Sequence, residues 1–344
     1  MRPHVDVDPE LLRAVEDHAV RLAREAGTLL LDSFQRDHQV EYKSEGNRDP
    51  VTEADKQAEE LLTAGIRDRF PDHGILGEES PESQGLDNDF VWVLDPLDGT
   101  YNFLNRYPFF GVSVGVLHKG VPVVGALFVP SPLKTGGQVL HARSGNSAFV
   151  DDEPVHAHDG GGEPGSGMVS LPGAFRSQFQ MGKELRRQIG EVRTTGSIVY
   201  EISLVASGVL CLAAFGGPRI WDVAAGVVIV REAGGEALAW TGRHWEPMLS
   251  FLERRTGLPS DGDLRQWRAG LVMSSMSLSR VVSDELKPRG GLLRWLRHQK
   301  ARIRARTWAR ERTDGNRASE TPSAPEDPPL DTEAPSPPGE TKES

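Results

Sequence analysis

A run of apolar residues that stops at a carboxylate constrains the fold of this chain more than any other feature. Residues 91–94 are Val-Trp-Val-Leu, and the next six residues are Asp-Pro-Leu-Asp-Gly-Thr. A short uninterrupted apolar run is typical of a strand buried on both faces. Pro96 and Gly99 favour a turn directly after it. We therefore expect Asp95 and Asp98 at the C-terminal edge of a sheet, where the active sites of layered α/β proteins usually open.

The turn that follows the strand has the composition of a cation site. Asp95, Asp98 and the carbonyl oxygen of Leu97 would share one small space, and two carboxylates so close resist ionisation unless a cation neutralises them. Oxygen ligands without nearby His or Cys favour Mg²⁺ over zinc. The amides of Gly99 and Thr100, if they open a helix, would face an anion such as phosphate. An exposed turn explains the same residues about equally well, because turns favour Asp and Gly.

Composition limits the class of protein. The chain has 344 residues, 38% of them hydrophobic and 26% charged, which is globular and long enough for two domains or one large layered domain with a tail. The net charge of −11 argues against a general nucleic-acid binder. Cys211 is the only cysteine, so intrachain disulfides and Cys-based zinc sites are excluded, and a cytoplasmic protein is expected. We see no signal peptide and no apolar run long enough for a transmembrane helix.

Periodicity divides the chain into helices and strands. Asp8-Pro9 begins an expected helix to about residue 34, and Thr52 begins a second to about residue 70. Residues 91–95 form the buried strand, 111–117 and 121–129 form a hairpin, and 221–235 form a helix that ends in paired glycines.

Four regions follow from this pattern. Gly- and Pro-rich sequence near 159–167 separates an N-terminal half, 1–160, from a C-terminal half, 161–286. Residues 287–318 are basic and include Trp295 and Trp308, so they could form an amphipathic helix on a membrane surface; a solvated charged extension is the more ordinary explanation. Residues 319–344 are rich in Pro and acids, and we expect them to be disordered.

Other acids precede or follow the central strand, and each has a plain structural explanation. Glu78 and Glu79 follow a short apolar segment, as an exposed loop pair could. Asp49 precedes a helix whose Thr52 and Asp55 resemble a capping box. Asp222 opens the helix 221–235, where an acid also suits the helix dipole.

Together, in this order, these motifs resemble the signatures of the inositol monophosphatase family. The matching segments are Asp49-Pro-Val-Thr-Glu-Ala-Asp55, Gly77-Glu-Glu-Ser80, residues 92–103 and Trp221-Asp-Val-Ala-Ala-Gly226. The likeness covers about residues 8–280. It implies a layered α-β-α-β-α sandwich of the sugar-phosphatase type, a lithium-sensitive Mg²⁺-dependent phosphatase related to fructose-1,6-bisphosphatase, and a homodimer.

The resemblance also implies a role for each matching residue. Glu78, Asp95 and the backbone oxygen of Leu97 would hold one Mg²⁺, and Asp95, Asp98 and Asp222 a second, with a third, weaker ion near Glu78. Thr100 and Asp49 would orient the attacking water and take its proton. The substrate would contact Leu97, Asp98, Asp222, the amides of Gly99 and Thr100 and, through its alcohol part, Gly196, Ser197 and Ile198. Lys43 could bind phosphate, although a solvated lysine needs no role.

The chain departs from the family pattern in the alcohol pocket. Phe215 stands where animal-type members carry a glutamate that contacts inositol, and Arg219 could bind a second phosphate or a carboxylate. The expected function is release of phosphate from a small polyol or sugar phosphate, as by inositol-1-monophosphatase. Fructose-1,6-bisphosphate and 3′-phosphoadenosine 5′-phosphate are alternative substrates. A non-catalytic binding or regulatory protein that acts through its tails is a further alternative.

Overall fold

The computed structural model describes residues 6–36, 40–42, 50–80, 84–158, 165–173, 175, 179–252 and 264–289. The expected tails from residue 290 onward, including the proposed membrane-surface segment and the expected disorder, lie outside these residues.

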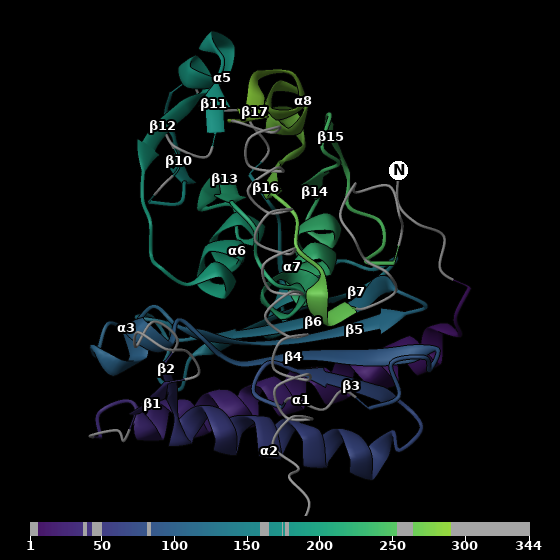
Figure 1. Ribbon diagram of the computed structural model, residues 1–344. Helices are drawn as coiled ribbons and strands as arrows, with labels where there is room; N and C mark the ends of the chain where they lie inside the picture. Colours follow the sequence, from purple (N-terminus) through teal and green to yellow (C-terminus); the bar gives the residue numbers. More distant parts are fainter. Residues whose placement is uncertain are drawn as a thin grey trace, which may run out of the picture. The chain divides into compact units, whose positions relative to one another are not determined.

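A seven-stranded sheet is the first of two large sheets. Its order is β3-β4-β5-β6-β7-β8-β9, with β3 parallel to β4 and the other neighbours antiparallel. The strands are β3 (Gly74–Gly77), β4 (Phe90–Asp98), β5 (Gly111–His118), β6 (Val121–Val129), β7 (Gln138–Arg143), β8 (Ala148–Val150) and β9 (Glu153–Val155). Helices α1 (Pro9–Ser33) and α2 (Glu53–Arg69) cover one face of this sheet (Figure 1).

The second sheet has six strands in the order β12-β10-β13-β16-β14-β15. The strands are β10 (Gly167–Ser170), β12 (Ile189–Val192), β13 (Leu210–Phe215), β14 (Gly235–Trp240), β15 (Trp245–Pro247) and β16 (Leu271–Ser275). Helices α6 (Ile198–Ala206) and α7 (Ile220–Glu232) lie between the two sheets, while α5 (Lys183–Gln188) and α8 (Met276–Glu285) cover the far face of the second (Figure 1). The order of layers is therefore α-β-α-β-α, which confirms the expected fold class.

Smaller elements connect the layers. They are the strand pairs β1 (Val40–Tyr42) with β2 (Pro50–Thr52) and β11 (Phe179–Met181) with β17 (Leu286–Pro288), the short helix α3 (Thr100–Leu104) and the 3-10 turn η2 (Leu264–Gln266). Among the described residues, no helix has both the length and the apolar character needed to cross a bilayer.

Three hydrophobic cores lie between the layers, and the alternation of side chains along each strand decides which core a side chain enters. In β5, Val112, Val114 and Val116 pack under the helices α1 and α2, while Leu117 belongs to the core between the two sheets. Successive side chains of a strand point to opposite faces, so one strand supplies both cores. A third core lies between the second sheet and the helices α5 and α8.

Two paired glycines allow α7 to lie directly on the first sheet. Gly115 and Gly125 face each other across β5 and β6. A Cβ atom at Gly115 would lie 2.8 Å from the backbone nitrogen of Ala225, and one at Gly125 would lie 2.3 Å from its carbonyl oxygen. The buried Ser113 hydroxyl also donates to the Trp221 carbonyl oxygen at 2.9 Å. The first turn of α7 is thereby fixed beside β5.

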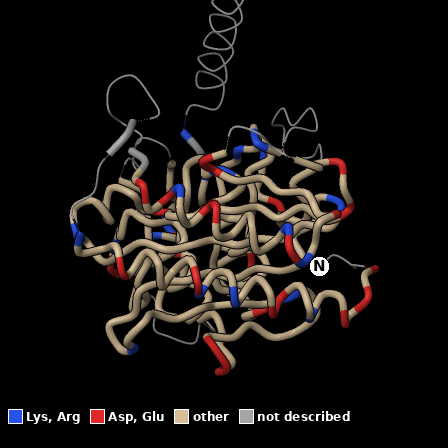
Figure 2. Tube along the Cα trace, turned by 90° about the horizontal axis from the view of Figure 1, so that it is seen from below, with Lys and Arg blue, Asp and Glu red and all other residues tan. Residues whose placement is uncertain are grey.

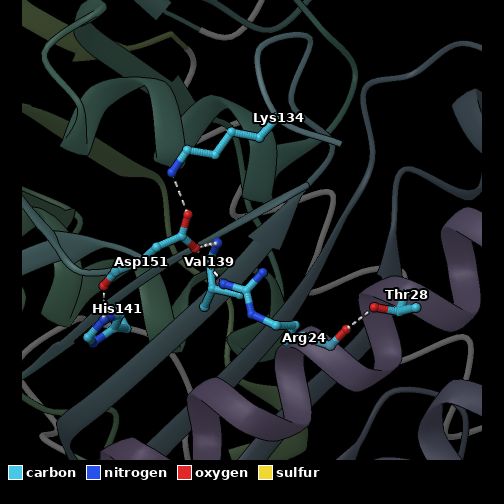
Figure 3. Close-up of polar contacts among 6 residues, drawn as sticks. All are labelled: Arg24, Thr28, Lys134, Val139, His141 and Asp151. Atoms are coloured by element: carbon cyan, nitrogen blue, oxygen red, sulfur yellow. Dashed lines mark hydrogen bonds and ion pairs between the residues drawn. The ribbon is translucent and has the colours of Figure 1, made fainter. Parts of the chain in front are cut away.

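A partly exposed polar cluster fastens α1 to the opposite edge of the same sheet. Figure 3 shows Arg24 and Lys134 both reaching the Asp151 carboxylate, which also accepts the Val139 amide at 3.0 Å. His141 Nε2 donates to the Asp151 carbonyl oxygen at 2.8 Å, and its Nδ1 lies 2.7 Å from Glu16 Oε1. Elsewhere, basic and acidic residues are interspersed along the described chain (Figure 2).

The structure corrects the expected end of the central strand. The run 91–95 was expected to end at Asp95, but β4 continues to Asp98 with a shift of register between Asp95 and Asp98. The two intervening residues, Pro96 and Leu97, have no ladder partner in β5, and pairing resumes where Asp98 meets Gly111. Pairing with β3 stops at Leu94, and the register with β5 shifts between Asp95 and Asp98, so the ladder needs no N–H from Pro96. The helix expected at 221–235 ends earlier, at Glu232.

Candidate active site

Asp95 lies at the point where β4 becomes irregular. It pairs with Ser113 of β5, and it is only 1% exposed. Its Oδ1 atom accepts the Leu97 amide at 3.1 Å, which closes a tight turn around the carboxylate. The Leu97 side chain is 2% exposed and packs in the core below the sheet. The turn is therefore anchored from below before any ligand arrives.

Gly99 redirects the chain from β4 into α3. Its φ of +89° lies in the left-handed region, and a Cβ there would lie 3.0 Å from the Phe109 carbonyl oxygen and 3.2 Å from Ser197 Cβ. Because only glycine adopts this backbone at little cost, Gly99 is required for the turn. The Thr100 hydroxyl that follows lies 3.2 Å from the Leu97 carbonyl oxygen and 3.4 Å from Asp55 Oδ1.

Asp55 reaches the turn from the first turn of α2. Its Oδ2 atom accepts the Thr52 amide at 2.8 Å and the Thr52 hydroxyl, and its own amide donates to that hydroxyl at 3.3 Å. The expected capping box is thereby confirmed. The same carboxylate presents its Oδ1 atom to Thr100, so Asp55 serves the helix and the candidate site at once. Asp55 is 1% exposed.

Asp98 connects the turn to the C-terminal half of the chain. Its Oδ2 atom accepts the Ser197 hydroxyl and, at 2.8 Å, the Val199 amide at the start of α6. Asn102 of α3 donates to the Thr195 carbonyl oxygen at 2.9 Å and joins the same two segments. The expected substrate loop, Gly196 to Ile198, is therefore adjacent to Asp98 and Gly99.

Asp222 lies in the first turn of α7. Its Oδ2 atom accepts the Arg219 amide at 2.7 Å. The position of this turn follows from the Ser113 bond to Trp221, because Ser113 is the ladder partner of Asp95. Asp222 and Asp95 consequently face one region from different layers.

The loop with Glu78 follows β3, next to β4. The Glu78 amide donates to the Leu94 carbonyl oxygen at 3.1 Å. Glu59 of α2, 3% exposed, accepts the amides of Glu79 at 2.8 Å and Ser80 at 2.7 Å. Gly77 leaves room for the Glu59 carboxyl group in this position, because a Cβ atom would lie 2.6 Å from it.

Burial and mutual repulsion dominate the electrostatics of this region. Burial, followed by the charges of Glu78, Asp98, Asp222 and Asp55, raises the pKa of Asp95 well above its ordinary value. Burial raises the pKa of Asp98 to about 7, in spite of the two hydrogen bonds that it accepts. Burial and then the charge of Asp98 raise the pKa of Asp222 in the same way. Each carboxylate thus lacks sufficient positive charge nearby.

The donor set fits a hard divalent cation. Asp95, Asp98 and Asp222 each use one carboxylate oxygen for the hydrogen bonds above, and the other oxygen accepts no hydrogen bond from the described residues. Free carboxylate oxygens are the ligands that Mg²⁺ prefers. As the side chains stand, no three of the described His, Cys, Asp or Glu residues could close around an ion. Unneutralised carboxylates repel one another, so a separation of this kind is the physical expectation without a cation.

Two of the expected site residues lie outside the described part of the chain. These are Asp49 and Lys43, so the expected pairing of Asp49 with Thr100 stays a prediction. The carboxylate that Thr100 does contact is Asp55, which the sequence reasoning treated only as a helix cap. Glu59 was missed as well. A signal was present: Asp55 and Glu59 are acids four residues apart on the face of α2 that also carries the buried Ala58 and Leu62.

Comparison with known proteins places this geometry in a family. The model of the inositol monophosphatase family matches residues 11–275. Nus factor SuhB of Escherichia coli K12 is 34% identical over 232 residues, which are 66% of this chain and 85% of that protein. Inositol monophosphatase 3 of Solanum lycopersicum is 34% identical over 233 residues, or 64% of this chain and 83% of that protein.

Solved structures agree with the sequence comparison. The extragenic suppressor protein suhB of Bartonella henselae superposes with a TM-score of 0.61 at 26% identity, over 78% of this chain and 98% of that one. An IMPase of Thermotoga maritima has a TM-score of 0.61 at 26% identity, over 77% of this chain and 94% of that one. From its sequence, its layered fold and its match over residues 11–275, the chain belongs to the inositol monophosphatase family.

Proposed function

We propose that the chain is a Mg²⁺-dependent phosphomonoester hydrolase of the inositol monophosphatase type, which releases phosphate from a small polyol or sugar phosphate. Family membership supports a phosphatase. The observation that carries the proposal concerns Asp95 and Asp98 at the end of β4 and Asp222 at the start of α7. They are close enough that the charge of Asp98 raises the pKa of both Asp95 and Asp222, and each of the three keeps one oxygen without a hydrogen bond from the described residues.

In this proposal Glu78, Asp95 and the Leu97 carbonyl oxygen hold one Mg²⁺, Asp95, Asp98 and Asp222 hold a second, and a third ion binds weakly near Glu78. Bound Mg²⁺ would make a water molecule more acidic and offset the charge of the phosphate oxygens. The single cysteine is consistent with a reaction in the cytoplasm.

Thr100 and Asp55 orient the attacking water in this proposal. When the Thr100 hydroxyl donates its proton to Asp55 Oδ1, the hydroxyl oxygen is left as an acceptor for a water O–H. Asp55 then lies at the end of a short path for the proton, and its burial limits competition from solvent. The amides of Gly99 and Thr100 contact the phosphate, and the loop from Gly196 to Ile198 contacts the alcohol part.

The test is phosphate release by the purified full-length chain. Asp95→Asn and Asp55→Asn should each lower kcat by about 10²-fold or more, with the far-ultraviolet circular dichroism spectrum unchanged. EDTA should abolish activity, Mg²⁺ should restore it, and lithium should inhibit it. Undiminished turnover by Asp95→Asn would refute the metal assignment, and undiminished turnover by Asp55→Asn would refute the proton path alone.

The substrate is a separate question, and two side chains favour an alternative to inositol phosphate. Phe215 is 5% exposed and packs in the core between the sheets, so it offers no hydrogen bond to a polyol. Arg219 lies with its guanidinium carbon 5.6 Å from the Trp221 ring centroid, beside Asp222, where it could contact a second anionic group. A panel containing inositol-1-phosphate, fructose-1,6-bisphosphate and 3′-phosphoadenosine 5′-phosphate decides this. Preference for inositol-1-phosphate over both others would reject the alternative.

A regulatory function is a second candidate, because several relatives are named as Nus factors. It is compatible with catalysis by the same chain. If no ester in the panel is hydrolysed and removal of residues 290–344 abolishes the binding of a cellular partner, the regulatory candidate is favoured. We also expect a homodimer, which sedimentation equilibrium of the purified chain would test.

A further inference from the structure

Arg265 joins two segments that are distant in the sequence. It lies in η2, and its Nη2 atom donates to the carbonyl oxygens of Gly77 at 2.8 Å and Ser80 at 2.6 Å. These carbonyls stand at the two ends of the loop that carries Glu78. An Nη2 group has two hydrogens, so both bonds form together. One guanidinium nitrogen thereby fixes the span of the loop.

The same guanidinium also contacts the helix that carries Asp222. Its central carbon lies 5.7 Å from the centroid of the Trp221 ring, within the range of a cation–π contact. Trp221 directly precedes Asp222 in α7. Arg265 therefore touches the backbone around one proposed metal ligand and the side chain next to another.

The backbone N–H groups of the loop with Glu78 bond toward the first sheet and α2. Glu59 of α2 accepts the amides of Glu79 and Ser80, and Glu78 itself donates a backbone bond to Leu94 in β4. All three bonds tie the N–H groups of the loop to the first sheet and its helices. Arg265 ties the carbonyl oxygens of Gly77 and Ser80 to the C-terminal half of the chain. Removing the guanidinium would take away both of these bonds and the contact with Trp221 of α7.

We propose that Arg265 is a positioning residue that sets the distance between Glu78 and Asp222 for cation binding. The inference rests on the proposed function, in that Glu78 and Asp222 hold Mg²⁺. Arg265 touches no substrate in this proposal. It acts through the loop carbonyls, as residues behind metal ligands commonly do when they fix ligand orientation.

The experiment compares Arg265→Met and Arg265→Lys in the full-length chain with Arg243→Met. Arg243 is an exposed arginine without a hydrogen bond among the described residues, so its variant controls for the loss of one positive charge. Isothermal titration of metal-free protein with Mg²⁺ gives the Kd, and hydrogen exchange of the peptide around residues 76–84 reports loop order. Steady-state kinetics against Mg²⁺ concentration separate the Mg²⁺ activation constant from kcat.

Arg265→Met should weaken Mg²⁺ binding by about 10- to 100-fold and speed exchange at residues 79 and 80, with kcat at saturating Mg²⁺ largely restored. Arg265→Lys keeps the positive charge but loses the planar guanidinium group, so its Kd for Mg²⁺ should lie between those of Arg265→Met and the wild type. Arg243→Met should match the wild type. If the wild type binds Mg²⁺ and Arg265→Met binds it equally well, the inference is wrong while the proposed function stands. If the wild type binds no Mg²⁺, both are wrong.

Discussion

Replacing Asp98 by asparagine should stabilise the metal-free protein at alkaline pH while it destroys activity. Asp98 is half-buried in a group of carboxylates, and its pKa in the folded protein is about 7 against an ordinary value of 3.8. The unfolded chain therefore loses this proton first as the pH rises. As the pH rises between these two pKa values, the free energy of unfolding of the metal-free protein falls. Above about pH 7, Asp98 is ionised in both states and the whole destabilisation by its charge is present.

The size of the effect follows from the two pKa values. A difference between 3.8 and about 7 corresponds to about 4 kcal/mol at most. The gain from Asp98→Asn should be smaller, about 1–3 kcal/mol, because an amide oxygen accepts the Ser197 and Val199 hydrogen bonds less strongly than a carboxylate. At a pH below 4 the gain should vanish, because the carboxyl group of the wild type is then protonated in both states.

Urea unfolding at pH 5 and pH 8, with EDTA or with Mg²⁺, measures the prediction. In EDTA at pH 8 the variant should be more stable than the wild type. With Mg²⁺ the order should reverse or narrow, because a cation that binds only the folded state stabilises the protein that retains its ligands. Asp152→Asn, which changes an exposed carboxylate, should stay within about 0.5 kcal/mol of the wild type. An Asp98→Asn protein less stable than the wild type in EDTA at pH 8 would show that burial and neighbouring charges do not make the ionised Asp98 destabilising.

Two further predictions concern the framework. Gly115→Ala should lower kcat/KM by about 10²-fold and the free energy of unfolding by about 1–3 kcal/mol, since the new Cβ would lie 2.8 Å from the backbone nitrogen of Ala225 and displace α7. Gly173→Ala, where a Cβ meets nothing within 4 Å, is its control. Burial opposes ionisation of Glu16 and His141. The bonds of Glu16 to His141 and Arg143 nevertheless lower the pKa of Glu16 below 4.5, and the bonds of His141 to Glu16 and to the Asp151 carbonyl raise the pKa of His141 above 6.5. The pair should therefore contribute fully to the free energy of unfolding between about pH 4.5 and 6.5. Glu16 becomes protonated at lower pH and His141 loses its proton at higher pH, so the difference in unfolding free energy between the wild type and Glu16→Gln should shrink on either side.

The elements of the fold that depend on local chemistry were predictable. Asp8 and Pro9 begin α1, and Thr52 with Asp55 caps α2, because both capping arrangements use residues within one helical turn. The hairpin of β5 and β6 follows from apolar runs separated by a short polar turn. The end of β4 was less predictable, because a bulge depends on pairing with β5 and a neighbouring strand is not visible in local sequence.

The candidate site shows the same division. Residues next to one another in the sequence, such as Asp95 and Asp98, could be placed together from the turn alone. Glu59 and Arg265 could not, since Glu59 bonds to a loop 20 residues away and Arg265 to one more than 180 residues away. An acid on the apolar face of a predicted helix was a usable signal for Glu59. An arginine in an irregular segment carries no comparable signal before the fold is known.

The opposing demands on the Asp95–Asp98 turn explain why so much of the fold surrounds it. Each aspartate uses one oxygen to accept hydrogen bonds from the backbone or from a hydroxyl. These bonds close the turn at Asp95 and fix the starts of α6 and α7. The same residues repel one another when ionised, which costs stability. A chain selected for stability alone would retain the hydrogen bonds with Asn or Ser and discard the charge. The presence of three carboxylates at a site that disfavours their ionisation therefore fits a site whose cost is offset by a bound cation, and the hydrogen-bonded oxygens hold each carboxylate in place for it.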